Sequence, residues 1–104
     1  MDKKYAAQEA ITHSMMGSLG LKLIEEKEGF IRASMPVNDN TSQPFGVLCG
    51  GASLAFAEII AGYGSYLCCP EGFIPVGSSV SGNHVSSVRK APDVWVYAEA
   101  TALH

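Results

Sequence analysis

A long apolar run with a single charged side chain restricts most strongly what this sequence can fold into. Between Asn40 and Pro70 the only charged residue is Glu58, and apolar or small residues surround it. A helix without a polar face is expected to be buried all round. A buried carboxylate costs free energy unless it is paired, hydrogen-bonded or used in chemistry. Glu58 is therefore either a structural carboxylate tied to a neighbouring amide or hydroxyl, or a functional residue.

The same run has the length of a membrane span, but its composition argues against one. Glu58 lies near its middle, five glycines interrupt residues 46–67, and no basic anchors flank it. The formal net charge is −3, and basic tracts reach only two residues, at Lys3–Lys4 and Arg89–Lys90. We therefore expect neither a membrane nor a nucleic acid as a partner.

The chain shows no sign of export. Its first residues lack the apolar segment of a signal peptide. Its three cysteines, two of them adjacent at Cys68 and Cys69, fit neither a disulfide framework nor a zinc site. We expect a cytoplasmic protein with reduced thiols and without a bound metal.

Glycine and proline positions and hydrophobic periodicity predict one α+β domain of 104 residues. Its elements are an N-terminal helix, a hairpin that turns near Glu28–Gly29, a turn-rich loop, a central helix and two further strands. The expected ranges are 3–16, 21–23 with 30–35, 36–42, about 49–67, 76–88 and 94–104. We expect an antiparallel sheet wrapped around the buried central helix.

The last predicted strand alternates in character. One face is expected to carry Trp95, Tyr97, Glu99 and Thr101. Because the sequence stops at His104, we expect an aromatic-rich strand edge without a partner.

The start of the central helix is a second functional feature. Gly50 and Gly51 let a ligand approach the first backbone N–H groups closely, and such groups can hold an oxyanion. Glu58 follows Gly50 by eight residues, which at about 1.5 Å per residue separates them by roughly 12 Å. Within one chain this is too far for both to act on one atom. Two antiparallel copies of the helix in a twofold dimer would bring Glu58 of one subunit toward Gly50 of the other.

Motifs around the central helix resemble a known family. Gln-Pro-Phe-Gly at 43–46, Gly-Gly-Ala at 50–52, Ala-Glu at 57–58 and Gly-Asn-His-Val at 82–85 resemble the hotdog-fold acyl-CoA thioesterases. The resemblance covers nearly the whole chain and is strongest to the PaaI-type branch, whose members act on hydroxybenzoyl-CoA and 1,4-dihydroxy-2-naphthoyl-CoA. It implies a single hotdog domain that hydrolyses an aromatic or hydroxyaryl acyl-CoA to a free acid and CoA.

The resemblance also implies a role for each candidate residue. Glu58 would attack the thioester directly or through water, the Gly50 amide would hold the thioester oxygen, and Gln43 would orient the acyl group. The candidates for binding substrate or CoA are Gly51, Gly62, Asn83, His84, Val85, Arg89 and Lys90. Among these, the segment around His84 would line the CoA channel, and the two basic residues would meet CoA phosphates. The family implies no metal or organic cofactor, and homodimers or homotetramers with sites at the dimer interface.

Three features depart from the family pattern. Cys49 stands where the family usually has the His of a His-Gly-Gly motif, and a thiol does not replace an imidazolium as a hydrogen-bond donor. Cys49 stays a catalytic candidate, as a small substitute or as a nucleophile at a helix N-terminus. Gly62 stands where these enzymes often carry Ser or Thr. The family continues past residue 104 with further strands, so we expect the domain to be C-terminally incomplete.

Two other functions stay open. A hydratase or dehydratase of acyl thioesters uses this fold, but it pairs a carboxylate with a catalytic His, and Cys49 counts against that pairing. A non-catalytic acyl-CoA binding protein is favoured by Cys49, Gly62 and the short C-terminus. His84 is alternatively a core histidine bonded within the sheet, and Arg89–Lys90 a solvated turn.

Overall fold

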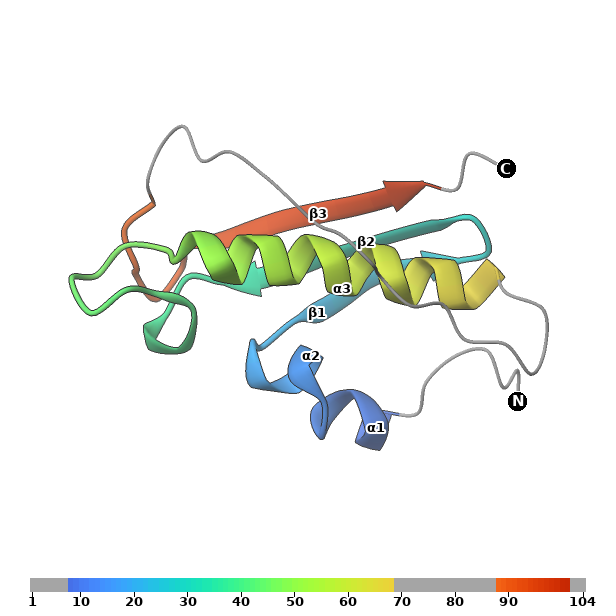
Figure 1. Cartoon of the computed structure of the whole chain (residues 1–104), viewed down its shortest axis with the longest axis horizontal. Coiled ribbons are helices and arrows are strands. Elements are labelled where there is room, and N and C mark those ends of the chain that lie inside the picture. The colour runs from blue at the N-terminus through green and yellow to red at the C-terminus, as the bar shows by residue number, and fades with distance from the viewer. Residues whose placement is uncertain (1–7, 69–87, 102–104) are drawn as a thin grey trace.

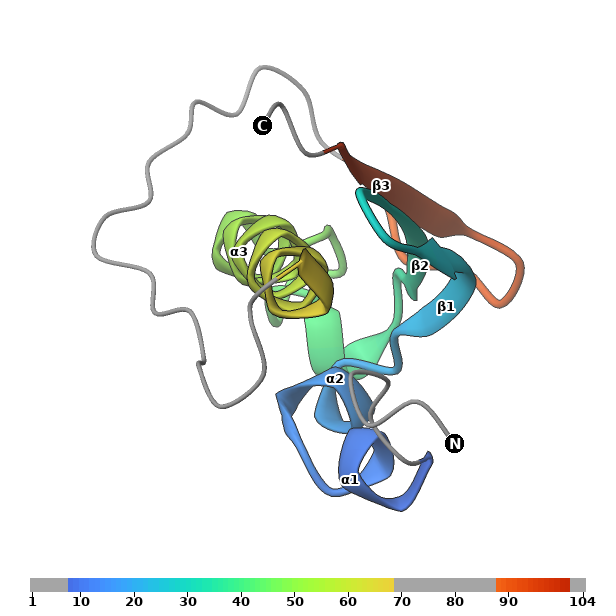
Figure 2. The ribbon, with the colours of Figure 1, turned by 90° about the vertical axis from the view of Figure 1, so that its right-hand side faces the viewer.

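A computed structural model describes residues 8–68 and 88–101 of the chain. Its helices are α1 (Gln8–Thr12), α2 (Met15–Ser18) and α3 (Gly50–Cys68); its strands are β1 (Lys22–Lys27), β2 (Phe30–Pro36) and β3 (Trp95–Thr101); and a short 3-10 helix covers Asp39–Thr41. The strands form one antiparallel sheet in the order β1-β2-β3. α3 lies along one face of this sheet, and α1 and α2 lie on the side of β1 (Figure 1 and Figure 2).

The β1–β2 hairpin forms where the sequence predicts it. Lys27 pairs with Phe30 across the turn, and Gly29 there adopts a φ of 89°, which suits glycine because it has no Cβ. β3 pairs with β2 over its whole length. Across this pair, Arg32 Nε donates to Glu99 Oε2 at 2.7 Å. The predicted hairpin turn and the strand that follows residue 94 are confirmed.

α3 packs on the sheet through one stripe of side chains. Its buried residues are Phe56, Ile60 and Leu67. The first two join Met16, Leu21, Ile31, Ala33 and Met35 in the main core. The helix approaches β2 closely at Gly64, where an added Cβ would lie 3.0 Å from Cγ2 of Ile31. An added Cβ at this position would require the Ile31 side chain to move by a few tenths of an ångström.

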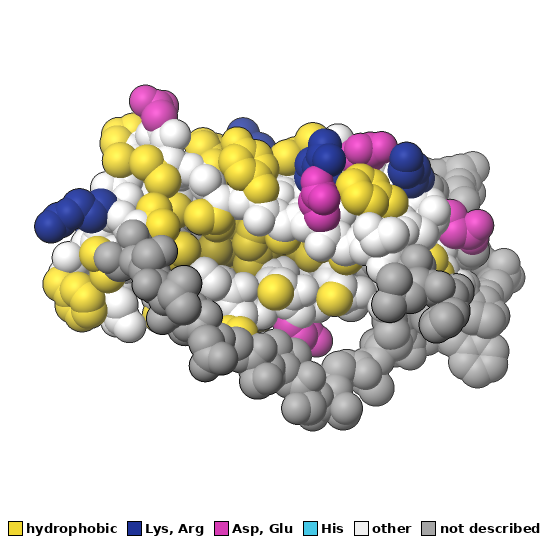
Figure 3. All heavy atoms as spheres, turned by 90° about the horizontal axis from the view of Figure 1, so that it is seen from above, with side chains coloured by type: hydrophobic (Ala, Val, Ile, Leu, Met, Phe, Trp, Pro, Cys, Tyr) yellow, Lys and Arg dark blue, Asp and Glu magenta, His cyan; other side chains and the backbone are white. Residues whose placement is uncertain are grey.

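β3 alternates between the two faces of the sheet as predicted. Its core face carries Val96, Ala98 and Ala100. Its outer face carries Trp95, which is half-buried, and the exposed Tyr97, Glu99 and Thr101. Within the described residues β3 pairs only with β2. Figure 3 views the molecule from the side on which β3 lies, and it shows a band of hydrophobic side chains along the molecule.

The start of α3 at Gly50 confirms the predicted start of the central helix, but the expectation that this helix is buried all round is wrong for the single chain. Gly51, Ala57, Ala61, Ser65 and Cys68 are exposed. The physical reason is coverage: the strands of the described residues lie against one side of α3 (Figure 2). The other side presents small residues and Glu58.

The predicted helix over residues 3–16 is interrupted in its described part. Ser14 Oγ donates to the Ile11 carbonyl at 2.7 Å and accepts from the Met16 N–H at 3.2 Å. Serine favours such breaks because its hydroxyl bonds nearby backbone groups in place of the helical pattern. Two short helices, α1 and α2, result.

Some of the predicted elements are only partly described. Residues 1–7 lie outside the described residues, and so does the predicted strand at 76–88 apart from Val88. None of the described helices is long and apolar enough to span a membrane.

Candidate active site

The start of α3 is held by backbone hydrogen bonds from a distant turn. Cys49 directly precedes the helix, and its carbonyl accepts from two first-turn N–H groups at 3.0 and 3.3 Å. The Cys49 N–H itself donates to the Thr41 carbonyl at 2.8 Å. Among the described residues, the Gly50 and Gly51 N–H groups have no backbone acceptor, as helix geometry requires of a first turn. Two donors therefore remain at the helix end that carries partial positive charge.

Gln43 begins a tight turn beside that helix end. Its N–H donates to the Val47 carbonyl at 2.8 Å, and its carbonyl accepts from the Gly46 N–H at 2.9 Å. Gly46 has a φ of 88°, a conformation that side chains with a Cβ rarely adopt. The side chain of Gln43 is exposed, so its amide is accessible to a ligand.

The segment with Arg89 and Lys90 pairs with the same turn. Arg89 forms an antiparallel bridge with Val47, and the Lys90 N–H donates to the Gly46 carbonyl at 2.9 Å. Both basic side chains are exposed. The structure therefore brings the two predicted phosphate contacts to the turn of Gln43, although they lie far from it in sequence.

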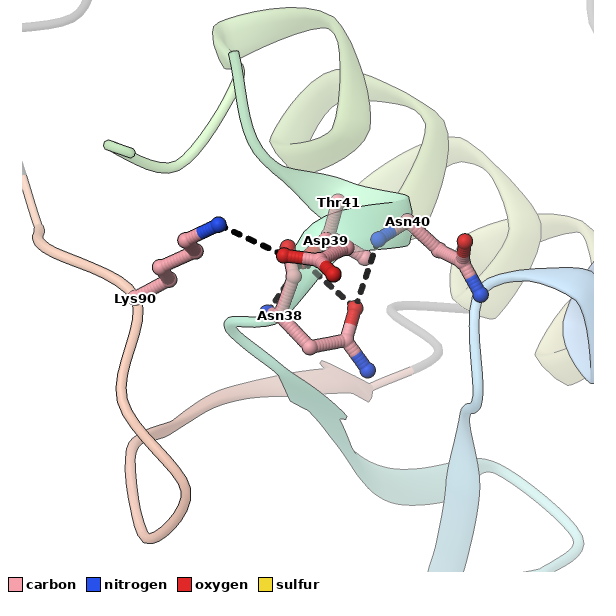
Figure 4. A network of polar contacts seen from close by, with 5 residues as sticks. All are labelled: Asn38, Asp39, Asn40, Thr41 and Lys90. Atoms are coloured by element: carbon pink, nitrogen blue, oxygen red, sulfur yellow. Dashed lines mark hydrogen bonds and ion pairs between the residues drawn. The ribbon is translucent and has the colours of Figure 1, made fainter. Parts of the chain in front are cut away.

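Lys90 already has an anionic partner. Its Nζ donates to Asp39 Oδ1 at 2.6 Å (Figure 4). This hydrogen bond and the positive charge of Lys90 lower the pKa of Asp39 below its ordinary value. Both side chains are exposed, so water screens the pair and another anion can reach the ammonium group.

Glu58 lies on the side of α3 that is turned away from the sheet. At about 100° per residue it is roughly 160° around the helix from the buried Phe56 and Ile60. Its side chain is half-buried, and within residues 8–68 and 88–101 its carboxylate has no hydrogen-bond or ionic partner. The described part of the chain thus lacks the neighbouring amide or hydroxyl that a purely structural role requires.

The predicted base and the predicted oxyanion donor are not brought together within one chain. Gly50 and Glu58 belong to one continuous helix, so the separation of roughly 12 Å along its axis applies. Gly62 lies one turn beyond Glu58, and an added Cβ there would meet nothing within 4 Å. A serine or threonine side chain therefore fits at this position in the single chain.

An open cavity of about 850 Å³ lies away from these groups, between the end of β2 and the start of β3. Its lining residues are Gly20, Pro36, Val37, Asn38, Asp39, Asn40, Lys90, Ala91, Pro92 and Trp95. Lys90 is the one predicted site residue among them. Neither Glu58 nor the Gly50 amide faces this cavity, so it is not where the predicted chemistry takes place.

Sequence reading missed Thr41, whose carbonyl holds the residue before α3. A signal for it exists in the pattern Asn-x-x-Thr at 38–41, which forms a capping box in the structure. Asn83, His84 and Val85 lie outside the described residues, so their contacts with CoA stay predictions.

Comparison with known proteins gives consistent matches. Residues 45–104 match the family model described as the thioesterase superfamily. The 1,4-dihydroxy-2-naphthoyl-CoA hydrolase of Escherichia coli is 39% identical over 77 residues, which are 74% of this chain and 57% of that protein. A relative from Haemophilus influenzae is 40% identical over 93 residues, 89% of this chain and 65% of its own length. The chain therefore spans less than two thirds of both relatives.

Solved structures match over a similar range. A crystal structure of a thioesterase from Haemophilus influenzae has a TM-score of 0.81 and 36% identity, and the match covers 100% of this chain and 74% of that one. A Staphylococcus aureus protein, matched at TM-scores of 0.76 and 0.78 with 32% and 33% identity, was solved as two alanine variants. These matches cover 86% and 88% of this chain and 73% and 74% of that one. The replaced residues are a glutamine and, fifteen positions later, a glutamate, the same separation as between Gln43 and Glu58.

Proposed function

This chain belongs to the thioesterase superfamily, and we propose that it hydrolyses an aromatic or hydroxyaryl acyl-CoA to a free acid and CoA. Its antiparallel sheet packed on a long helix is the hotdog arrangement of that family. The observation that carries the proposal is a helix with two features: first-turn N–H donors without a backbone acceptor in the described chain, and a half-buried carboxylate without a described partner. The name of the Escherichia coli relative supports the hydroxyaryl class of substrate.

The proposed reaction uses Glu58 as a base or nucleophile. In the water-mediated route, Glu58 takes a proton from water as the water oxygen adds to the thioester carbonyl carbon. The carbonyl electron pair moves to its oxygen, which accepts a hydrogen bond from the Gly50 N–H. The carbonyl then re-forms as the C–S bond breaks, and the leaving sulfur takes the proton from Glu58, so CoA leaves as a thiol. In the direct route, the carboxylate adds to the thioester carbon, the C–S bond breaks, and the CoA thiolate leaves an anhydride on Glu58. Water then cleaves the anhydride to the free acid and the Glu58 carboxylate, and the proton released from water goes to the CoA thiolate.

The proposed site lies between two subunits. Because roughly 12 Å separates Glu58 from the Gly50 amide on one helix, the two groups act together only across a twofold axis. The side of α3 that carries Glu58 is lined by small residues such as Gly51, Ala57 and Ala61, which are exposed in the single chain. Small residues on this side suit the close approach of a second subunit. A homodimer, alone or within a tetramer, is the proposed assembly.

The remaining residues are proposed to bind the substrate. Gln43 orients the acyl group from its exposed position in the turn. Arg89 and Lys90 contact CoA phosphates beside that turn, and residues 83–85 line the CoA channel. The reaction needs no metal or organic cofactor. We also propose a cytoplasmic location, where the three cysteines stay reduced.

A thiol-release assay over benzoyl-, 4-hydroxybenzoyl-, short- and medium-chain acyl-CoAs tests the reaction. We expect free CoA, fastest with the aromatic substrates, and its loss in Glu58→Ala. Tight binding of acyl-CoA without release of CoA would identify a binding protein instead.

A mixed dimer tests the shared site. Glu58→Ala and Gly50→Pro each disable both sites of a homodimer, but a mixed dimer regains one site that contains both native groups. With random mixing, we expect about a quarter of wild-type activity. Activity that stays at the level of the separate variants, or a wild-type enzyme active as a monomer, would contradict the shared site.

A further inference from the structure

We propose that Thr41 is a positioning residue for the oxyanion donor, because its hydroxyl and its carbonyl together tie the start of α3 to the end of β2. The inference rests on the proposed function, in which the Gly50 N–H holds the thioester oxygen. Thr41 lies in the 3-10 helix Asp39–Thr41, and its side chain is almost completely buried, with 1% exposed. It does not itself face the substrate.

The Thr41 hydroxyl joins two backbone groups at the end of β2. Its Oγ1 donates to the Pro36 carbonyl at 2.7 Å and accepts from the Asn38 N–H at 3.0 Å. Figure 4 shows the same turn from close by, with Asn38, Asn40 and Thr41 around one network. Since a buried backbone group without a partner costs free energy, these bonds fix the turn relative to the sheet.

The Thr41 carbonyl transmits this position to the helix. It accepts from the Cys49 N–H at 2.8 Å, and Cys49 is bonded directly to Gly50. The sheet is therefore connected to the proposed oxyanion donor by a path of two hydrogen bonds and one peptide bond. It runs from Pro36 through Thr41 and Cys49 to Gly50. Cys49 offers no side-chain oxygen to cap the first turn, so the bond to Thr41 is the described contact that holds its N–H.

Loss of the hydroxyl should affect turnover more than binding. In Thr41→Val the Pro36 carbonyl and the Asn38 N–H lose their partner, and the turn that holds Cys49 can shift. Removal of an oxyanion donor costs about 10²- to 10³-fold in kcat, and small misplacement of a reacting group can cost about 10²-fold. We expect kcat for benzoyl-CoA to fall about 10- to 100-fold, with KM changed by less than about threefold, because Lys90, the proposed CoA contact beside this turn, is also held by the Gly46 carbonyl at 2.9 Å.

Two matched variants separate the hydroxyl from general packing. Thr41→Ser keeps the hydroxyl and loses the methyl group, so kcat should stay within about threefold of wild type. Ser42→Ala removes the neighbouring hydroxyl, which is buried and has no partner in the described chain, so its kcat should also stay near wild type. Equal losses of kcat in Thr41→Val and Thr41→Ser, or a wild-type kcat in a folded Thr41→Val, would overturn the proposal.

A gentler variant covers the case in which Thr41→Val does not fold. Asn38→Ala removes the side-chain acceptor of the Asn40 N–H, at 3.0 Å, and a longer contact in which the same oxygen accepts from the Thr41 hydroxyl, at 3.4 Å. It leaves the bonds of that hydroxyl to the Pro36 carbonyl and the Asn38 N–H. We expect kcat to fall about twofold to fivefold at constant KM. An unchanged kcat in this variant would count against the proposed path.

Hydrogen exchange distinguishes failure of this inference from failure of the proposed function. If the wild-type protein releases no CoA from any acyl-CoA tested, the proposed function fails. The anchoring is then tested by the Cys49 amide, whose hydrogen exchange should be at least about tenfold faster in Thr41→Val than in wild type. If only Asn38→Ala folds, its Cys49 amide should exchange about twofold to fivefold faster than that of wild type. Equal exchange rates would overturn it.

Discussion

The first turn of α3 and the middle of the same helix are supported in opposite ways. The first turn is fixed from several sides: Thr41 holds Cys49, and the pairing of Gly46 with Lys90 holds the adjoining turn. Glu58, two turns later, has no described hydrogen-bond or ionic partner. The contrast indicates that the described chain fixes the first-turn N–H groups by itself, whereas it offers no partner to the carboxylate.

The largest loss of activity is expected for a substitution of Glu58, in the middle of α3. Glu58→Ala should lower kcat for benzoyl-CoA by about 10³-fold, within the usual range for loss of a general base. Because the described chain gives the carboxylate no partner, the free energy of unfolding should change by no more than about 0.5 kcal/mol. Thiol release and chemical denaturation measure the two quantities. A large loss of stability would show that Glu58 has a structural partner and would remove the contrast.

The first turn of α3 is tested by Gly50→Pro, which removes the backbone N–H at a helix position where proline is tolerated. We expect kcat to fall about 10²-fold while the thermal unfolding midpoint stays within a few degrees. Gly50→Ala keeps the N–H and serves as the control, with a much smaller loss. If the two variants lose activity equally, crowding rather than the missing donor is responsible.

Cys49→His should increase the difference between the first turn of α3 and the middle of this helix, because it adds an imidazole N–H donor beside the first turn. An imidazole N–H donates a stronger hydrogen bond to the thioester oxygen than a thiol does. We expect kcat to rise about tenfold, as measured by thiol release. In the Glu58→Ala background the gain should disappear. No gain in the wild-type background would contradict the role inferred for this position.

The smallest effects concern the ion pair of Asp39 with Lys90. Lys90→Ala should raise KM for acyl-CoA about threefold, and Asp39→Asn should lower it about twofold by freeing the ammonium group for a phosphate. Initial rates at varied substrate concentration measure both changes. An opposite change of KM in either variant would show that Lys90 does not contact the substrate.

The pH dependence of this pair has a defined sign. The lowered pKa of Asp39 means that the pair is fully formed above the ordinary aspartate pKa and is lost only as the pH falls through the lowered value. The effect of Asp39→Asn on KM should therefore be constant from about pH 5.5 to 8.

Elements whose signal is local were predictable from the sequence. The hairpin turn at Gly29, the start of α3 at Gly50 and the alternation of β3 depend on residues a few positions apart. The break at Ser14 is also local, but the hydroxyl competes only weakly with a helical pattern. The coverage of α3 was predicted wrongly because it depends on how many strands lie against the helix, which periodicity does not state.

The candidate site divides in the same way. Gln43, Gly50 and Glu58 could be named as candidates because they stand in one continuous stretch with recognisable spacing. The contact of Thr41 with Cys49 and the ion pair of Asp39 with Lys90 were not found, because each joins segments that only the folded chain brings together. The pattern Asn-x-x-Thr at 38–41 predicts the turn of Thr41, but it does not state which distant segment that turn contacts.

The continuity of α3 gives the proposed dimer a mechanical property. A helix that carries the donor at one end and the carboxylate two turns later behaves as a rigid rod shared by two reaction centres. If the rod slides along its axis, the donor shifts in one centre and the carboxylate shifts in the other by the same distance. The donor and the carboxylate therefore cannot be realigned in one centre without a change in the other. A substitution that displaces α3 impairs both centres together.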